Sequence, residues 1–334
     1  TVRTTVQLIE ADTEDHLWAK SFERDLTDIL ALQADVARAV AAEVQLALTP
    51  EDEARLASTR TVNPEAHEAY LKGSYHWQKI TPTDLDTAER YFELALEKDP
   101  AYAPIYKGLA YVWIFRQQMG LVPPHEAGPK ARAAALQAIA LDDESAGEHE
   151  VAAVIKTWID WDWAGAETEL LRAVDLNPNT AILYATYSQL LAFVGRTDEA
   201  VARSERALEL DPVNAFLHAL NAAVLCFDRR YDAALAAANT ALAMQPENPI
   251  AHFYSLVAAS NTGRHSEALT TLKKFLSFTY GEPADDEALD QAWAQGGFTG
   301  AMRRAATIMA EHYSTSRSIP ADTAIFFAVA QEYD

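Results

Sequence analysis

The chain has 334 residues, of which 49% are hydrophobic, and its formal net charge is −22 at pH 7. A surface this acidic repels phosphate backbones, so the composition argues against direct contact with nucleic acid. Cys226 is the single cysteine, which excludes an intrachain disulfide, and no apolar run is long enough to predict a membrane span.

The first 60 residues predict a small β-hairpin followed by a helix. Residues 2–8 alternate between apolar and polar side chains, and a second strand pattern follows the turn at "DTED". Residues 27–47 then carry apolar side chains at helical spacing, namely Ile29, Leu32, Val36, Val40, Val44 and Leu48. Because two strands alone are marginally stable, we expect a further strand from an upstream segment or from another chain. The start at Thr1, without methionine, favours a piece of a longer protein.

The centre of the chain repeats itself every 34 residues. Three sets of residues follow this step: Ala166, Ala200, Ala234 and Ala268; Ala173, Ala207 and Ala241; and Pro178, Pro212 and Pro246. A period of this length in a helix-forming sequence is typical of stacked helical hairpins. In the unit at 181–212, Gly195 suits the end of the first helix, Asp198 the start of the second, and Pro212 the turn that follows.

These residues resemble the tetratricopeptide repeat (TPR). The resemblance gives units at 69–102, 103–146, 147–180, 181–214, 215–248 and 249–282, and the longer second unit predicts an extra loop at 119–129. Residues 284–313 predict two further helices around Gly296 and Gly297, and residues 321–331 predict the first helix of another hairpin. The expected fold is mainly α, a TPR α-α superhelix at 64–334 that follows the β-hairpin and helix of residues 1–60.

The string "VQLIEADTEDHLWAKSFERDLTDILALQADVARAVAAEV" resembles the end of a TolB-like amino-terminal module. That module lies between an effector domain and a TPR array in bacterial signalling proteins. The effector is a CadC-like winged-helix DNA-binding domain, a class III adenylate/guanylate cyclase or a Ser/Thr kinase. The resemblance implies a regulatory region in the bacterial cytoplasm, or in the periplasm if the parent is a CadC-like membrane regulator.

The sequence carries no motif for catalysis, for a cofactor or for a metal, so we expect the segment itself to be no enzyme. His218 and His252 are 34 residues apart and form either a ligand pair or a repeated packing position, and we favour packing. The acidic cluster at 285–290 suits the start of a helix. We expect Cys226 to be buried, and the tryptophans of "WIDWDW" to pack mainly in the core.

In TPR-like arrays the first helix of each hairpin lines a concave groove, and this resemblance predicts the groove residues. They are Ile155, Trp158, Ile182, Phe193, Phe216, Phe227, Ile250, Phe253 and Val257. This lining is apolar and aromatic and lacks the lysines and arginines that would hold an acidic peptide terminus. An amphipathic helix or an apolar peptide is therefore the expected guest. Alternatives are a segment of the same chain, a second protomer or a small molecule.

The resulting hypothesis is a non-catalytic scaffold that binds a protein or peptide partner and regulates an upstream effector. A module that dimerises that effector, with self-association as a homodimer, is the alternative. Sedimentation distinguishes the two, because a strict monomer would exclude assembly by this segment.

Overall fold

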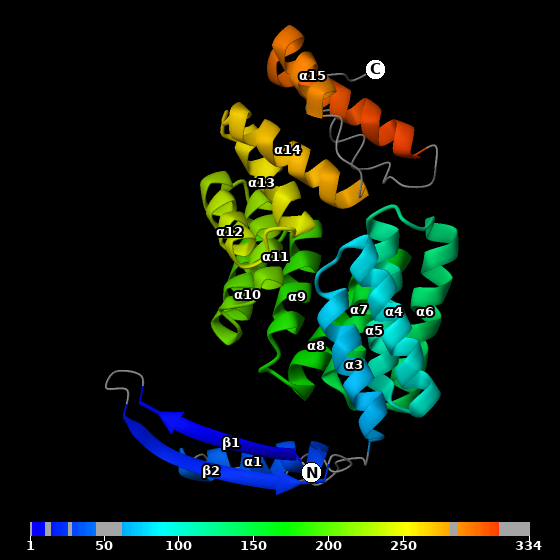
Figure 1. Cartoon of the computed structure of the whole chain (residues 1–334), viewed down its shortest axis with the longest axis vertical. Coiled ribbons are helices and arrows are strands. Elements are labelled where there is room, and N and C mark those ends of the chain that lie inside the picture. Colours follow the sequence, from blue (N-terminus) through cyan, green and yellow to red (C-terminus); the bar gives the residue numbers. More distant parts are fainter. Residues whose placement is uncertain (1, 11–14, 26–28, 45–61, 281–285, 314–334) are drawn as a thin grey trace. The chain divides into compact units, whose positions relative to one another are not determined.

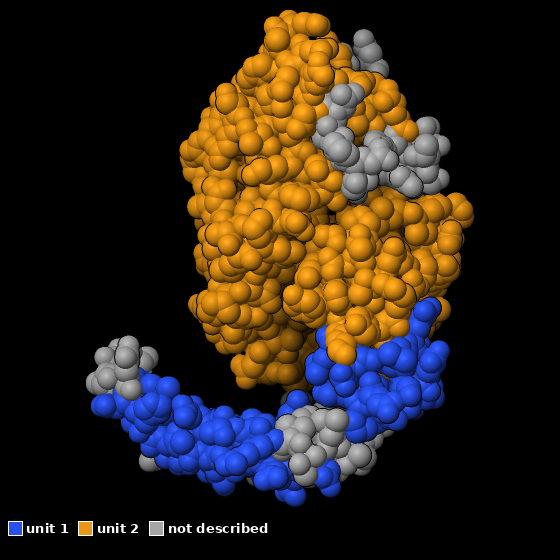
Figure 2. Space-filling model, in the orientation of Figure 1, with its two compact units in different colours: residues 1–71, 93–102 blue, residues 72–92, 103–334 orange. Residues whose placement is uncertain are grey.

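The computed structural model describes residues 2–10, 15–25, 29–44, 62–280 and 286–313 (Figure 1). The expectations for Leu48, for the connector after it and for a helix at 321–331 lie outside the described residues. The chain divides into two compact units (Figure 2), which consist of Thr1–Leu71 with Glu93–Tyr102 and of Lys72–Phe92 with Ala103–Asp334.

The first unit contains the predicted hairpin. Strands β1 (Val2–Ile9) and β2 (His16–Arg24) pair antiparallel, with Thr4 opposite Phe22 and Leu8 opposite Trp18. These four side chains are partly buried while their neighbours along the strands are exposed, which confirms the alternation. Helix α1 (Ile29–Glu43) packs on β2, and the Arg24 guanidinium binds the Asp35 carboxylate at 2.6 Å.

Helical hairpins follow one another along the rest of the chain (Figure 1). The helices are α3 (Pro64–Trp77), α4 (Pro82–Lys98), α5 (Ala103–Gln118), α6 (Pro124–Leu141), α7 (Ala146–Ile155), the π-helical turn η2 (Lys156–Asp160), α8 (Trp163–Leu176), α9 (Ala181–Phe193), α10 (Thr197–Leu210), α11 (Ala215–Phe227), α12 (Tyr231–Met244), α13 (Pro249–Asn261), α14 (His265–Tyr280) and α15 (Asp286–Tyr313). No described helix combines the length and the apolar character that crossing a bilayer requires.

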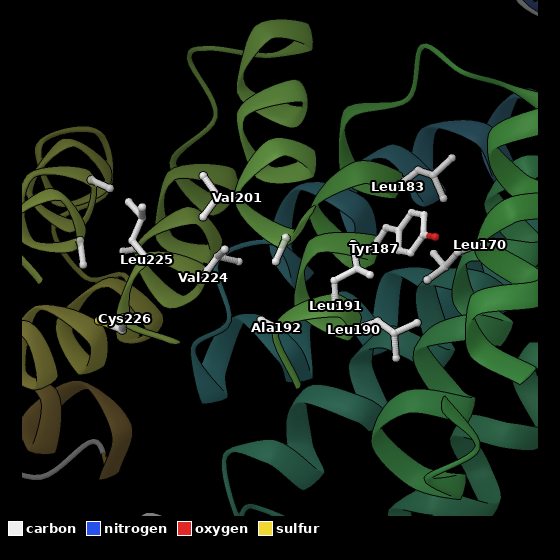
Figure 3. Packing of buried hydrophobic residues seen from close by; sticks show 14 of the residues in the cluster. Leu170, Leu183, Tyr187, Leu190, Leu191, Ala192, Val201, Val224, Leu225 and Cys226 are labelled. Carbon is white, nitrogen blue, oxygen red and sulfur yellow. The ribbon is translucent and has the colours of Figure 1, made fainter. Parts of the chain in front are cut away.

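The repeated alanines lie where the two helices of each hairpin approach one another. Ala166, Ala200, Ala234 and Ala268 are each 0% exposed. Around the first three, a core of leucines, valines and Tyr187 joins consecutive hairpins (Figure 3), and Ala268 belongs to a neighbouring cluster with Leu256 and Leu272. Small side chains at these positions let the helix backbones come close, and the larger apolar residues fill the space between hairpins.

Each turn between the paired helices follows the same 34-residue step. Gly195 (φ 80°) and Gly263 (φ 72°) adopt the left-handed conformation predicted for a helix end, and Arg229 (φ 60°) adopts it at the equivalent place. Asp198 lies in the first turn of α10, as expected for a carboxylate near a helix amino terminus.

Two predictions about chain breaks have different outcomes. The loop predicted at 119–129 is wrong for its second half, because α6 begins at Pro124 and runs through Pro129. Pro123 and Pro124 occupy the positions before and at the helix start, where proline fits because no backbone donor is needed. The break predicted around Gly296 and Gly297 is confirmed, since Gly297 (φ 60°) interrupts α15.

Candidate functional site

Three aromatic side chains from successive first helices meet edge to face. The ring centroid of Trp158, in η2, lies 4.7 Å from that of Phe193, at the end of α9, and the two ring planes make an angle of 86°. The ring centroids of Phe193 and of Phe227, at the end of α11, are 5.5 Å apart, and their ring planes make an angle of 80°. Such edge-to-face contacts are the favoured geometry for aromatic pairs. We call Trp158, Phe193 and Phe227 the aromatic ladder.

The aromatic ladder is open to solvent. Phe227 is 43% exposed, and Trp158 and Phe193 are partly buried. Asn261 stands at the next step of the repeat, and its side-chain amide donates to the carbonyl of Val257, so the ladder gives way to a polar residue there. The structure thus brings together three of the nine residues predicted to line the groove.

The other predicted groove residues differ in what they offer a partner. Ile155 (4%) and Phe216 (6%) are buried, so neither has surface for a guest in this arrangement. The remaining four are partly buried and pack within the array, namely Ile182, Ile250, Phe253 and Val257.

Phe216 is buried because rings from distant helices cover it. Trp77, at the end of α3, and Phe115 of α5 each meet it edge-on with 6.1 Å between ring centroids. Trp77 also stacks on Tyr111, with 4.5 Å between the ring centroids and an angle of 6° between the ring planes. These contacts join side chains that are far apart in the sequence, and no local sequence pattern predicts them.

A buried polar network lies beside this aromatic cluster. Tyr111 and Thr186 both donate hydrogen bonds to Glu150 Oε1, the latter at 2.6 Å. Glu150 is 2% exposed, and burial raises its pKa above the ordinary value of a glutamate. Burial, together with the neighbouring Glu150, raises the pKa of Tyr111. The network therefore pairs Glu150 Oε1 with two hydroxyl donors inside the fold.

Comparison with known proteins adds two kinds of similarity, and no family model matches the chain. This chain is 30% identical over 161 residues to a protein of Rhizobium meliloti (strain 1021) named "Putative adenylate cyclase 3". The match covers 47% of this chain and 27% of that relative. The structure of a human IFIT1 dimer with m7Gppp-AAAA has a TM-score of 0.58 at 15% identity, covering 85% of this chain and 64% of that one.

The structure of the APC/C hetero-tetramer Cut9-Hcn1 has a TM-score of 0.52 at 16% identity, covering 79% of this chain and 55% of that one. Identities this low speak to the fold alone. The structural similarities and the 34-residue helical hairpins together establish the fold. The fold is a TPR solenoid.

Within the TPR array, His218 and His252 occupy the repeated packing position that the sequence analysis favoured. Nε2 of each ring pairs with the carbonyl oxygen six residues earlier, at 2.9 Å for Pro212 and at 2.8 Å for Pro246. Among the residues with described positions, no group of three or more His, Cys, Asp or Glu side chains is arranged to hold a metal ion.

The expectation that the tryptophans of "WIDWDW" pack in the core is wrong for two of them. Trp161 is 73% exposed and Trp163 is 42% exposed, while Trp158 is partly buried in the aromatic ladder. The reason is local: η2 adds a wider turn at the end of α7, and Trp161 follows it in the left-handed conformation (φ 58°). The sequence contains a signal for this left-handed conformation, because Trp161 lies one 34-residue step before Gly195, which was predicted to adopt it.

Proposed function

We propose that the TPR array is a non-catalytic scaffold whose aromatic ladder binds a segment of a protein partner. The observation that carries the proposal is the run of solvent-accessible rings at Trp158, Phe193 and Phe227 on successive hairpins. Aromatic side chains are enriched in protein interfaces, where they supply apolar area at a low cost in side-chain entropy. A repeat scaffold presents such residues at fixed spacing along one face.

The chemistry of the partner follows from charge. The ladder is apolar, whereas the chain as a whole carries 49 acidic against 27 basic side chains. A partner segment therefore gains most if its apolar face is flanked by lysine or arginine, since complementary charge favours encounter and register. An amphipathic, basic helix meets both requirements. The same charge argues against the RNA-like ligand that is present in the IFIT1 structure.

The similarity to the Rhizobium meliloti protein supports a place in bacterial signalling. The match covers 27% of that relative, and the role that we propose for this TPR array is regulatory rather than catalytic. We place this role in the bacterial cytoplasm, in keeping with the cyclase-like relative.

The test is a titration of the chain with a fluorescent model helix of leucine and lysine, read by anisotropy. A peptide of the same composition in scrambled order controls for charge. We expect Phe227→Asp to weaken binding of the helix about tenfold or more, as the loss of an interface aromatic does. Leu171→Asp is the matched control, because Leu171 is similarly exposed at 49% but lies on the second helix α8. Equal affinity for the two peptides would contradict the proposal.

One observation favours the alternative, an assembly module. The sheet that the structure describes consists of β1 and β2, so each strand has an edge without a strand beside it among the described residues. Ile9 (48%) and Leu17 (55%) are exposed on these strands. Unpaired edges of this kind pair readily with another strand. Sedimentation at micromolar concentration tests the alternative, and a strict monomer would exclude it.

A further inference from the structure

Two hairpins that are far apart in the array contact one another. The hairpins α3–α4 and α11–α12 are separated along the chain by α5–α6, α7–α8 and α9–α10. Contacts nevertheless join the end of α3 to the start of α11 and to the turn after α12. The stability of a repeat array comes mainly from each unit and from its contacts with neighbouring units. A contact between distant hairpins can therefore break while each hairpin stays folded.

The contact centres on one phenylalanine that is held by two rings. The rings of Trp77 and Phe115 are nearly parallel, with an angle of 20° between their planes and 5.9 Å between their centroids. The ring of Phe216 stands nearly perpendicular to both, at 82° to Trp77 and 79° to Phe115. This is the geometry that aromatic pairs prefer. We call Trp77 and Phe115 the aromatic socket, and Phe216 fills it.

Gln245 ties the same two hairpins together by a hydrogen bond. It stands where the preceding unit has Asp211, and its Oε1 accepts from Asn248 at 3.1 Å, as Asp211 accepts from Asn214 at 2.9 Å. Its Nε2 donates to the carbonyl oxygen of Lys79 at 3.1 Å, which an aspartate side chain cannot do. The glutamine thus keeps the local contact of the repeat and adds a bond to the turn after α3.

The turn that receives this bond is strained and covered. Ile80 has φ 54°, and a β-branched residue with positive φ is an outlier. Its side chain is 1% exposed, whereas Gly195, Arg229 and Gly263, the left-handed residues of later turns, are exposed. Strain of this kind persists where the surrounding structure holds it, and it is frequent in ligand clamps and switch regions.

We propose that Phe216 is an intramolecular ligand of the aromatic socket, and that an aromatic residue of a partner helix replaces it when the array opens. The closed array inhibits itself, because a residue of the same chain has a high effective concentration at the socket. The partner is a helix with an aromatic residue in its first turn, since Phe216 has that position in α11. The aromatic socket and the aromatic ladder share no side chain, so the two sites can be tested separately.

The probe is a fluorescent peptide with the sequence of residues 211–220, which contains Phe216 and the helix cap Asn214. Anisotropy measures its affinity for the whole chain. We expect Phe216→Ala to bind the peptide about tenfold more tightly than the unchanged protein does, because this variant leaves the aromatic socket free. The same peptide with alanine in place of its phenylalanine should bind neither protein.

Gln245→Asp tests the opening without changing the aromatic socket. It removes the donor to Lys79 and restores the residue type of Asp211, so the turn after α12 should still fold. Loss of this hydrogen bond favours the open array and should raise the affinity for the peptide about fivefold. A purely structural role of Gln245 would leave the affinity unchanged. Ile250→Ala is the matched control, because Ile250 lies one 34-residue step after Phe216 and outside the socket.

A distance measurement reports the opening itself. Thr83→Cys and Asn239→Cys place spin labels on exposed positions of α4 and α12. The unchanged array should show one distance between the labels, and Gln245→Asp should add a longer one. If Phe216→Ala fails to fold, Gln245→Asp still decides the question. Equal peptide affinity for Phe216→Ala and Ile250→Ala, absence of binding to folded Phe216→Ala, or a single unchanged distance in Gln245→Asp would each overturn the proposal.

Discussion

The ring of Trp77 meets the ring of Phe216 edge-on, with 6.1 Å between their centroids, although one ends α3 and the other begins α11. A hydrogen bond at 3.1 Å from the Gln245 side chain, just after α12, to the carbonyl of Lys79 lies in the same region. The turn after α3 is therefore tied to α11 and α12 by an aromatic cluster and by a hydrogen bond. This arrangement explains why Phe216 is covered.

Replacing Trp77 should test this contact. Trp77→Ala removes a stack on Tyr111 and the edge contact with Phe216, and we expect it to lower the free energy of unfolding by about 3–5 kcal/mol. Urea denaturation of Trp77→Ala, Phe216→Ala and the double variant should give a coupling of about 0.5–1.5 kcal/mol. Strict additivity would show that the two rings do not interact in solution.

Phe92 fills the space between α3 and α5 at the positions of two glycines. A Cβ on Gly108 would overlap the Phe92 ring, so we expect Gly108→Ala to destabilise the array by about 1–3 kcal/mol. Gly296→Ala is the control, because a Cβ there meets no described atom within 4 Å. Equal unfolding midpoints for the two variants would argue against this packing.

Glu150 should make stability depend on pH in a defined direction. Because burial raises its pKa, the folded protein holds this proton more tightly than the unfolded chain does. The free energy of unfolding therefore falls as pH rises from the ordinary carboxyl range through the raised pKa. Glu150→Gln lacks this decline, so its stability relative to the unchanged protein should increase with pH. Denaturation at several pH values measures this difference, and a constant difference would contradict the assignment.

Cys226 should be inert in the folded protein. Burial raises the pKa of its thiol to about 12, and the side chain is 8% exposed. Because the thiolate is the reactive form, a disulfide reagent at pH 8 should modify Cys226 only as the chain unfolds. The rate of modification should follow urea concentration in the same way as unfolding does. Rapid modification of the native protein would show that this part of the core opens.

The 34-residue step was sufficient to predict the array, because alanines such as Ala200 and turn residues such as Gly195 act within one hairpin. It also located part of the aromatic ladder, since Phe193 and Phe227 are one step apart. The 34-residue step does not predict the contact between Trp77 and Phe216. Such a contact depends on small rotations that accumulate over several hairpins, and no single position encodes them.

The region around Trp161 shows a second limit. Composition and periodicity predicted a packed tryptophan, because large aromatic residues usually lie in cores. The π-helical turn and the left-handed backbone overrode that tendency. The loop prediction at 119–129 is wrong in its second half for a related reason. Prolines are typical of loops, but proline also fits the first turn of a helix, where Pro123 and Pro124 lie.

The most direct test of the aromatic ladder is photo-crosslinking in cells that express the full-length protein. A benzophenone side chain at position 227 should form crosslinks to a partner segment with an apolar face flanked by basic residues, and the same group at 171 should not. Mass spectrometry identifies the crosslinked residues. Equal crosslinking from 171, or crosslinks from 227 only to copies of the same protein, would contradict the partner-binding account.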